Sequence, residues 1–257
     1  MYPDEAAIES KETKELIVDS LRRKTASIDF RFRSRLARCG DTVNVCNLPM
    51  CPLCVDRLAR LLVFEMTRSL LGLREFGQIP MSWLSADLSD VRVPIGELSR
   101  LDLLHLNRRI SRRYDRVGFP LTFSSVRLVV IAGTRKRKPM WQARVDSLII
   151  GALHRRVEHL LIRWQGGQLP RGSLGIIRVD DVVFAAIKPV PYQVTAPDDE
   201  LECMLANAPQ QAELARWLAQ YQISDRYALT GLCWADGQLM VQLNARASLA
   251  TTAITTT

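Results

Sequence analysis

The clearest periodic pattern in the chain lies in residues 96–117, where apolar side chains recur every three or four positions. These apolar positions are Leu103, Leu106, Ile110, Tyr114 and Val117. Because an α-helix turns once in about 3.6 residues, this spacing places them on one stripe. The opposite surface carries five arginines, which are Arg108, Arg109, Arg112, Arg113 and Arg116. The pattern predicts an amphipathic helix with one buried face and one strongly basic face.

Two segments that follow this helix have the pattern of β-strands. Residues 125–131 are β-branched and apolar, and residues 141–150 alternate so that Arg144 and Asp146 share one face of the predicted strand. The basic sequence Arg135-Lys136-Arg137-Lys138 lies between the two segments. We therefore expect a hairpin whose loop presents four cations to solvent.

The remaining pattern mixes helices and strands. Further helices are predicted at 4–26, from near 54 to 73, at 152–165, at 180–188 and at 200–221. Further strands are predicted at 82–93, at 176–179 and in a hairpin over 227–243 that turns at Asp236-Gly237. Residues 30–56 look irregular, with an arginine-rich start. This order predicts an α+β fold, in which an antiparallel central sheet with helices packed on it follows a cysteine-rich zinc-binding segment.

The same pattern suggests a division of the chain. We expect an N-terminal helical extension over 1–30 and a zinc-binding segment with a basic helix over 31–75. A sheet domain over 76–243 and a flexible tail over 244–257 follow. The length of 257 residues and a hydrophobic content of 47% suffice for one large core with a small appendage.

Composition narrows the class of protein. No apolar run approaches the roughly 18 residues that cross a bilayer, and the chain opens with Met1-Tyr2-Pro3-Asp4-Glu5 rather than with the apolar region of a secretory signal. We therefore expect a cytoplasmic protein with no membrane partner.

Charge is distributed unevenly along the chain. Residues 100–178 carry 17 basic and 4 acidic side chains, whereas residues 1–99 carry 14 of each and residues 179–257 carry 4 basic and 9 acidic ones. A concentrated positive field attracts polyanions, and nucleic acid is the usual one. A solvated basic face with no partner is the alternative interpretation.

Four cysteines lie close together in the sequence, at positions 39, 46, 51 and 54. The Cys51-x2-Cys54 spacing lets two thiolates reach one tetrahedral ion at about 2.3 Å, and Cys39 and Cys46 complete a four-thiolate structural zinc site. Buried free thiols and disulfides remain as alternatives. Cys203 and Cys233 stand apart in the sequence and are expected in the core.

Taken in order, several motifs resemble those of the replication initiator proteins of rolling-circle plasmids, which belong to the His-hydrophobic-His nuclease superfamily. The segments that carry the resemblance are Cys46 with Cys51-Pro52-Leu53-Cys54, Arg57-Leu58-Ala59-Arg60, the strand from Trp141 to Ile149, Phe184-Ala185-Ala186-Ile187-Lys188-Pro189, and Tyr227 to Leu232. The resemblance covers about residues 30–240. It implies a nuclease-type fold that binds DNA during plasmid replication.

The chain departs from this family at the positions that carry the chemistry. The resemblance implies a metal-binding histidine pair where Arg144 and Asp146 stand, and a tyrosine nucleophile where Ala185 stands. An arginine cannot lose its proton to become a metal ligand, and an alanine has no nucleophilic atom. We expect Arg144 and Asp146 to pair with each other in place of a catalytic divalent metal. Tyr192 is the one candidate for a substitute nucleophile.

These observations predict a DNA-binding relative of a rolling-circle initiator that keeps a zinc site but cannot nick DNA. Its expected contacts, to single-stranded or duplex DNA, are the five helix arginines and the basic loop Arg135-Lys136-Arg137-Lys138. Two alternatives remain open. One is an active nicking-joining initiator that uses Tyr192, and the other is a zinc-stapled module that binds an acidic protein. The three histidines, His105, His154 and His159, suggest no catalytic role.

Overall fold

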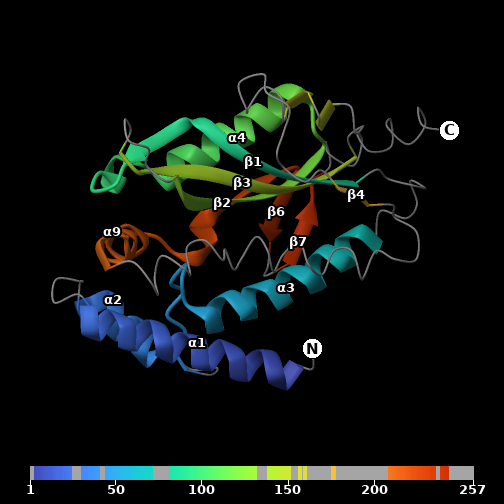
Figure 1. The fold of residues 1–257 in the computed structure, drawn as a ribbon. Helices are drawn as coiled ribbons and strands as arrows, with labels where there is room; N and C mark the ends of the chain where they lie inside the picture. Colours follow the sequence, from blue (N-terminus) through green and yellow to red (C-terminus); the bar gives the residue numbers. More distant parts are fainter. Residues whose placement is uncertain are drawn as a thin grey trace.

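The computed structural model describes most of the chain (Figure 1). The described residues are 3–24, 30–40, 44–71, 81–131, 138–151, 156–157, 159–160, 175–177, 208–235 and 238–242. Within them, three helices precede an antiparallel sheet, and further helices pack on that sheet. The predicted α+β class, with a four-cysteine cluster ahead of the sheet, is confirmed.

The three N-terminal helices pack together: α1 (Pro3–Lys24), α2 (Phe30–Arg38) and α3 (Pro52–Leu71). Ile17 and Leu21 of α1 are fully buried, one turn apart, against this group. The prediction that residues 30–56 are irregular is wrong for α2. Phe32 and Leu36 lie four positions apart and are both buried, so this arginine-rich segment is an amphipathic helix.

Five strands form the central sheet in the order β4-β1-β3-β2-β5, and every neighbouring pair is antiparallel. The strands are β1 (Met81–Pro94), β2 (Leu121–Ile131), β3 (Met140–Ile150), β4 (Gly175–Ile177) and β5 (Tyr227–Thr230). A separate hairpin pairs β6 (Leu232–Ala235) with β7 (Gln238–Val241). Ala235 pairs with Gln238, which leaves two residues for the connection, as predicted. The hairpin is shorter than the predicted 227–243, because residues 227–230 pair with β2 in the central sheet.

The amphipathic helix forms as α4 (Leu103–Val117) and lies along one face of the sheet (Figure 1). Its predicted stripe is buried apart from Val117, which is half-buried. Tyr114 Oη and Ser147 Oγ share a hydrogen bond of 2.5 Å, so α4 covers the face of β3 that carries odd-numbered residues. Arg144 and Asp146 therefore lie on the opposite face of the sheet.

The predicted helix is longer than the observed one at its start. Residues 98–100 form a short 3-10 helix, and Asp102 then caps α4 by accepting a hydrogen bond from the backbone N of His105 at 3.1 Å. A side-chain cap satisfies one of the free N–H groups at a helix start. Gly118, at φ 75°, ends the helix in the left-handed conformation that glycine adopts readily.

Helix α9 (Ala208–Leu218) joins the sheet to the N-terminal helices. The buried Glu213 carboxylate accepts hydrogen bonds from the backbone N of Gly96 and Leu98 and from the Trp141 indole, at 2.8, 2.6 and 2.8 Å. On another side of α9, the Gln211 amide donates to Ser20 of α1 at 2.8 Å. One buried apolar cluster therefore runs from the N-terminal helices into the α4 side of the sheet.

Several predictions lie outside the described residues. These are the helix at 180–188, most of the helix at 152–165, the first part of the helix at 200–221 and the tail at 244–257. Residues 156–157 and 159–160 are helical where they are described. The division of the chain into domains stays a prediction.

Candidate metal centre and basic surface

The four cysteines come together where α2 ends and α3 begins. Cys39 follows the last residue of α2, and its backbone N donates to Leu36 O at 3.2 Å. Cys51 directly precedes Pro52, the first residue of α3, and its carbonyl accepts from Val55 N at 2.9 Å. A proline at the first helical position has no N–H to leave unsatisfied, so the helix starts cleanly there. Cys54 then lies in the first turn of α3, on the same side as Cys51.

The geometry of the sulfur atoms fits one tetrahedral ion. The four Sγ atoms lie within 4.8 Å of one another, with separations of 3.5 Å for Cys39–Cys54 and 3.6 Å for Cys46–Cys54. Four thiolates at about 2.3 Å from a central zinc ion are about 3.8 Å apart, because the edge of a tetrahedron is about 1.6 times its radius. The four cysteines are free and buried, so the disulfide alternative does not apply here.

The cysteines of the cluster change one another's pKa values. Hydrogen bonds from Cys46 and Cys51 hold the pKa of the Cys54 thiol well below its usual range, and the backbone N–H of Asn47 adds to this. Hydrogen bonds to Cys46 and Cys54, together with burial, raise the pKa of Cys51. The first helical turn also favours a thiolate at Cys54. Of these thiols, Cys54 is the one whose surroundings most favour the thiolate form.

Two cations lie next to the cluster. The buried Lys14 ammonium of α1 donates to the carbonyl of Cys39 at 2.8 Å, and Arg35 of α2 donates to the carbonyl of Cys46 at 2.7 Å. Four thiolates and one divalent ion carry a net charge of about −2. A buried charge of that size requires nearby compensation, and these two side chains supply charge of the opposite sign and equal size.

The cysteine loop is also tied to the sheet. Asn47, at φ 52°, presents its carbonyl to the backbone N of Ile223, in the 3-10 segment Ile223–Arg226, at 2.9 Å. Leu48 and Met50 are buried in the common apolar cluster. The cysteine loop is therefore in contact with residues outside the N-terminal helices.

The five arginines of α4 fall into two groups. Arg109 and Arg113 both form ion pairs with Asp90 of β1, the second at 3.2 Å. Burial and the neighbouring arginine lower the pKa of Arg109, and burial and Arg116 lower that of Arg113. The outward row consists of Arg108, Arg112 and Arg116. All three are exposed, and among the described residues none has an ion-pair partner.

The outward row follows the helix axis. Its members are four positions apart, which is a rise of about 6 Å per step. A hollow of about 440 Å³ lies between this row and the edge strand β5. It is lined by Leu104, Asn107, Arg108, Ser111, Arg112, Ser224, Asp225, Tyr227, Ala228 and Leu229. The row therefore borders a partly polar depression.

The basic loop is described only at its end. Lys138 is exposed, whereas Arg135, Lys136 and Arg137 lie outside the described residues. The strands on either side pair as a hairpin, with Ile131 opposite Met140. The predicted hairpin is therefore confirmed.

Arg144 and Asp146 make ion pairs with residues of the strands on either side of β3. Arg144 pairs with Asp87 of β1 at 2.6 Å, and Asp146 pairs with Arg127 of β2 at 2.7 Å. The expectation that Arg144 and Asp146 are each other's main partner is therefore corrected. Burial raises the pKa of Asp146, against the opposing effects of Arg127, Ser85 and Arg144. The even-numbered face of β3 thus carries a partly buried charge network.

The remaining predicted site residues are not described. Ala185 and Tyr192, and also His154, lie outside the described part of the chain. His105 is exposed on α4, and His159 is exposed beside Arg156. Sequence reasoning missed Asp87, Asp90 and Arg127 as ion-pair partners, because they lie far from Arg144, the α4 arginines and Asp146 in sequence.

Comparison with protein-family models, with curated proteins and with solved structures finds no match to this chain. The resemblance to rolling-circle initiators therefore stays a prediction from the motifs. Among the described helices, none has the length and apolar content that a membrane span requires.

Proposed function

We propose that the protein binds DNA through the outward row of α4, is stapled by one zinc ion at the four cysteines, and lacks nicking activity. The observation that supports this most strongly is the division of the α4 arginines. Asp90 neutralises two of them, and the other three remain exposed and without acidic partners among the described residues. Aligned arginines on one helix repel each other, and a polyanion offsets that cost.

Zinc is the ion that the ligand set favours. Four thiolates in tetrahedral arrangement suit zinc or an iron–sulfur cluster, and a fully buried four-cysteine centre with sulfur atoms 3.5 and 3.6 Å apart matches a single ion. The site is closed, because all four ligands come from the protein. A closed site stabilises structure and leaves no position for a substrate.

The absence of nicking is inferred from the charge network on β3. The Asp146 side chain is only 2% exposed and is paired with Arg127, while the guanidinium of Arg144 is paired with Asp87. A buried, paired carboxylate next to a guanidinium is a poor ligand for a divalent ion. This network lies across the sheet from α4, so DNA on the outward row would not contact it.

The experiment measures DNA binding as a function of salt. Each phosphate contact contributes about 0.9 to the slope of log K against log salt on duplex DNA, so replacing the outward row by glutamine should reduce the slope by nearly 3. A slope that the triple variant does not change would refute the assignment of the surface.

Two neighbouring single variants provide the control. Arg112→Gln and Arg113→Gln remove the same charge from the same helix, but Arg112 faces outward whereas Arg113 is paired with Asp90. We expect a loss of about 0.9 in slope for the first and a smaller change for the second. Equal changes in slope for the two variants would mean that DNA binding depends on the net charge of the helix and not on which arginine faces outward.

Nicking is tested separately with a single-stranded oligonucleotide and Mn²⁺ or Mg²⁺. We expect no covalent protein–DNA adduct and no cleaved strand. An adduct that disappears in Tyr192→Phe would establish an active initiator instead. If no DNA binds at low salt and an acidic protein co-purifies, the chain is an interaction module.

A further inference from the structure

A second hollow, of about 370 Å³, lies at the C-terminal end of α4 and shares only Arg116 with the sites above. Its lining comes from two segments far apart in sequence, Arg116 and Val117 of α4 and Arg156, His159 and Leu160. The volume falls in the range of small-molecule sites, which is about 300–1,000 Å³. It is therefore large enough for a ligand of modest size.

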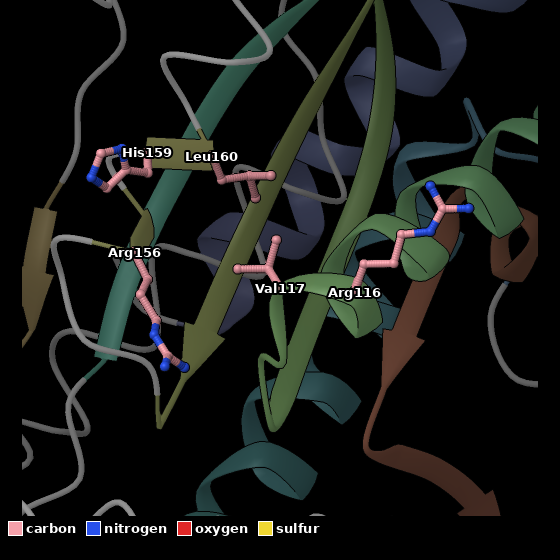
Figure 2. Close-up of a pocket in the computed structure, with 5 residues that line it drawn as sticks. All are labelled: Arg116, Val117, Arg156, His159 and Leu160. Carbon is pink, nitrogen blue, oxygen red and sulfur yellow. The ribbon is translucent and has the colours of Figure 1, made fainter.

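The centre of this hollow is apolar. Figure 2 shows Val117 and Leu160 facing each other, with Arg156 and His159 on one side and Arg116 on the other. The end groups of Arg156 and His159 extend in different directions, and the guanidinium of Arg116 extends away from the apolar pair. Leu160 is 5% exposed and Val117 is half-buried, so both are fixed by the surrounding structure. An apolar ring placed between them would lose contact with water without burying any polar group of the protein.

The rim of the hollow is cationic. Among the residues that the structure describes, no acidic one contributes to its lining, and Arg116 and Arg156 have no ion-pair partner. Arg156 and His159 are three positions apart in a helical segment, which places them on the same face. Arginine binds phosphate oxygens with two parallel N–H donors, and either form of a histidine has at least one N–H to donate.

We propose that this hollow binds a phosphomonoester attached to a ring, as in a nucleoside monophosphate. The phosphate would lie against Arg156 and His159, and the ring would lie between Val117 and Leu160. Arg116, on the other side, is exposed, and its long side chain would turn toward the ring to stack its planar guanidinium on a base. The ligand would be a free nucleotide or the 5′-phosphorylated end of a strand, and the inference does not require that DNA bind the outward row, with which the hollow shares Arg116.

The test titrates the full chain by calorimetry with adenosine 5′-monophosphate, adenosine and inorganic phosphate. We expect saturable binding of the nucleotide with a Kd below about 1 mM and at least tenfold weaker binding of the other two. Inorganic phosphate that binds as tightly as the nucleotide would overturn the proposal, because the apolar centre would then contribute nothing. The absence of saturable nucleotide binding would overturn it as well.

Variants locate the site. Arg156→Gln removes a charge-assisted hydrogen bond and should weaken nucleotide binding about tenfold or more, whereas Lys11→Gln removes the same charge from an exposed position of α1 and should change little. Val117→Asp should weaken binding further, and its thermal unfolding midpoint shows whether the fold is intact. If Val117→Asp does not fold, Arg156→Gln decides. Equal effects of Arg156→Gln and Lys11→Gln would overturn the proposal.

The source of the ligand is distinguished with two oligonucleotides of the same sequence, one with a 5′-phosphate and one without. Tighter binding of the phosphorylated strand, reversed by the nucleotide, supports a strand end. Equal binding of the two strands, together with nucleotide binding, supports a free nucleotide. If DNA binds with the expected salt slope but the nucleotide does not bind, this inference fails and the proposed function stands.

Discussion

Removal of the metal should destabilise the whole protein, because the cysteine loop is built into the common core. Cys39, Cys46, Cys51 and Cys54 belong to the same buried cluster as residues of the sheet, and Asn47 bonds to the segment that precedes β5. Metal binding to the folded state alone is therefore linked to global unfolding. The perturbation is extraction of the ion with a chelator, or the substitution Cys54→Ser.

The magnitude follows from linkage. When free zinc exceeds its dissociation constant by a thousandfold, it stabilises the folded state by about 4 kcal/mol. For a chain of this size, about 1 kcal/mol moves the unfolding midpoint by 2–4 °C, so metal removal should lower the midpoint by roughly 8–16 °C. Cys54→Ser should cause a similar loss and make the protein insensitive to the chelator.

The assay combines metal analysis with thermal unfolding followed by circular dichroism. The purified chain should contain one zinc ion per molecule. Cys233→Ser is the matched control, because Cys233 lies in β6 outside the cluster, and this variant should keep its metal. A wild-type protein that holds no metal, with the same midpoint before and after chelation, would show that the cluster consists of buried thiols only.

Three further predictions concern charge. Since the pKa values of Cys46 and Cys51 are raised in the metal-free cluster, zinc binding at neutral pH should release at least two protons per ion, measurable by calorimetry in buffers of different ionisation enthalpy. The folded-state pKa of Asp146 is raised, so its contribution to stability is present below the unfolded pKa of about 3.9 and is lost as pH rises through the folded value. Denaturant unfolding should therefore show the stability of wild type falling relative to that of Asp146→Asn as the pH rises above about 3.9, and a constant difference would contradict this. Asp90→Asn should release the two arginines that Asp90 neutralises and steepen the salt dependence of DNA binding, whereas an unchanged slope would show that Arg109 and Arg113 do not reach the phosphates.

Local pattern was sufficient to predict several elements and the cysteine cluster. The apolar stripe of α4 identified its buried face, and the Cys51-x2-Cys54 spacing identified the metal centre, since both depend on residues close in sequence. The start of α4 was predicted too early, although Asp102 directly before Leu103 is a cap signal in the sequence. In α2, the many arginines masked the four-residue spacing of Phe32 and Leu36.

The pairing of charges was beyond the reach of local pattern. Asp90 lies 19 and 23 positions from the arginines it neutralises, and only the packing of α4 on the sheet brings them together. Likewise, Asp87 meets Arg144 through the register of β1 on β3. A hollow such as the one beside Arg156 and His159 also requires tertiary structure, because its lining comes from two distant segments.

Two carboxylates of β1, Asp87 and Asp90, decide which cations are left for a polyanion. Asp87 is opposite Arg144 and Arg92 is opposite Gln142, so four residues of β1 stand where β3 has only Ala143. Asp87 and Asp90 are three positions apart, and side chains an odd number of positions apart in a strand point to opposite faces. Asp87 pairs with Arg144 on the face away from α4, while Asp90 reaches α4 itself. Asp87 and Asp90 neutralise arginines on both sides of the sheet. The net positive charge counted for residues 100–178 therefore overstates the basic surface that is available to a partner. The outward row remains for a polyanion because, among the described residues, no acidic side chain forms an ion pair with it, although Asp225 lines the hollow beside Arg108 and Arg112.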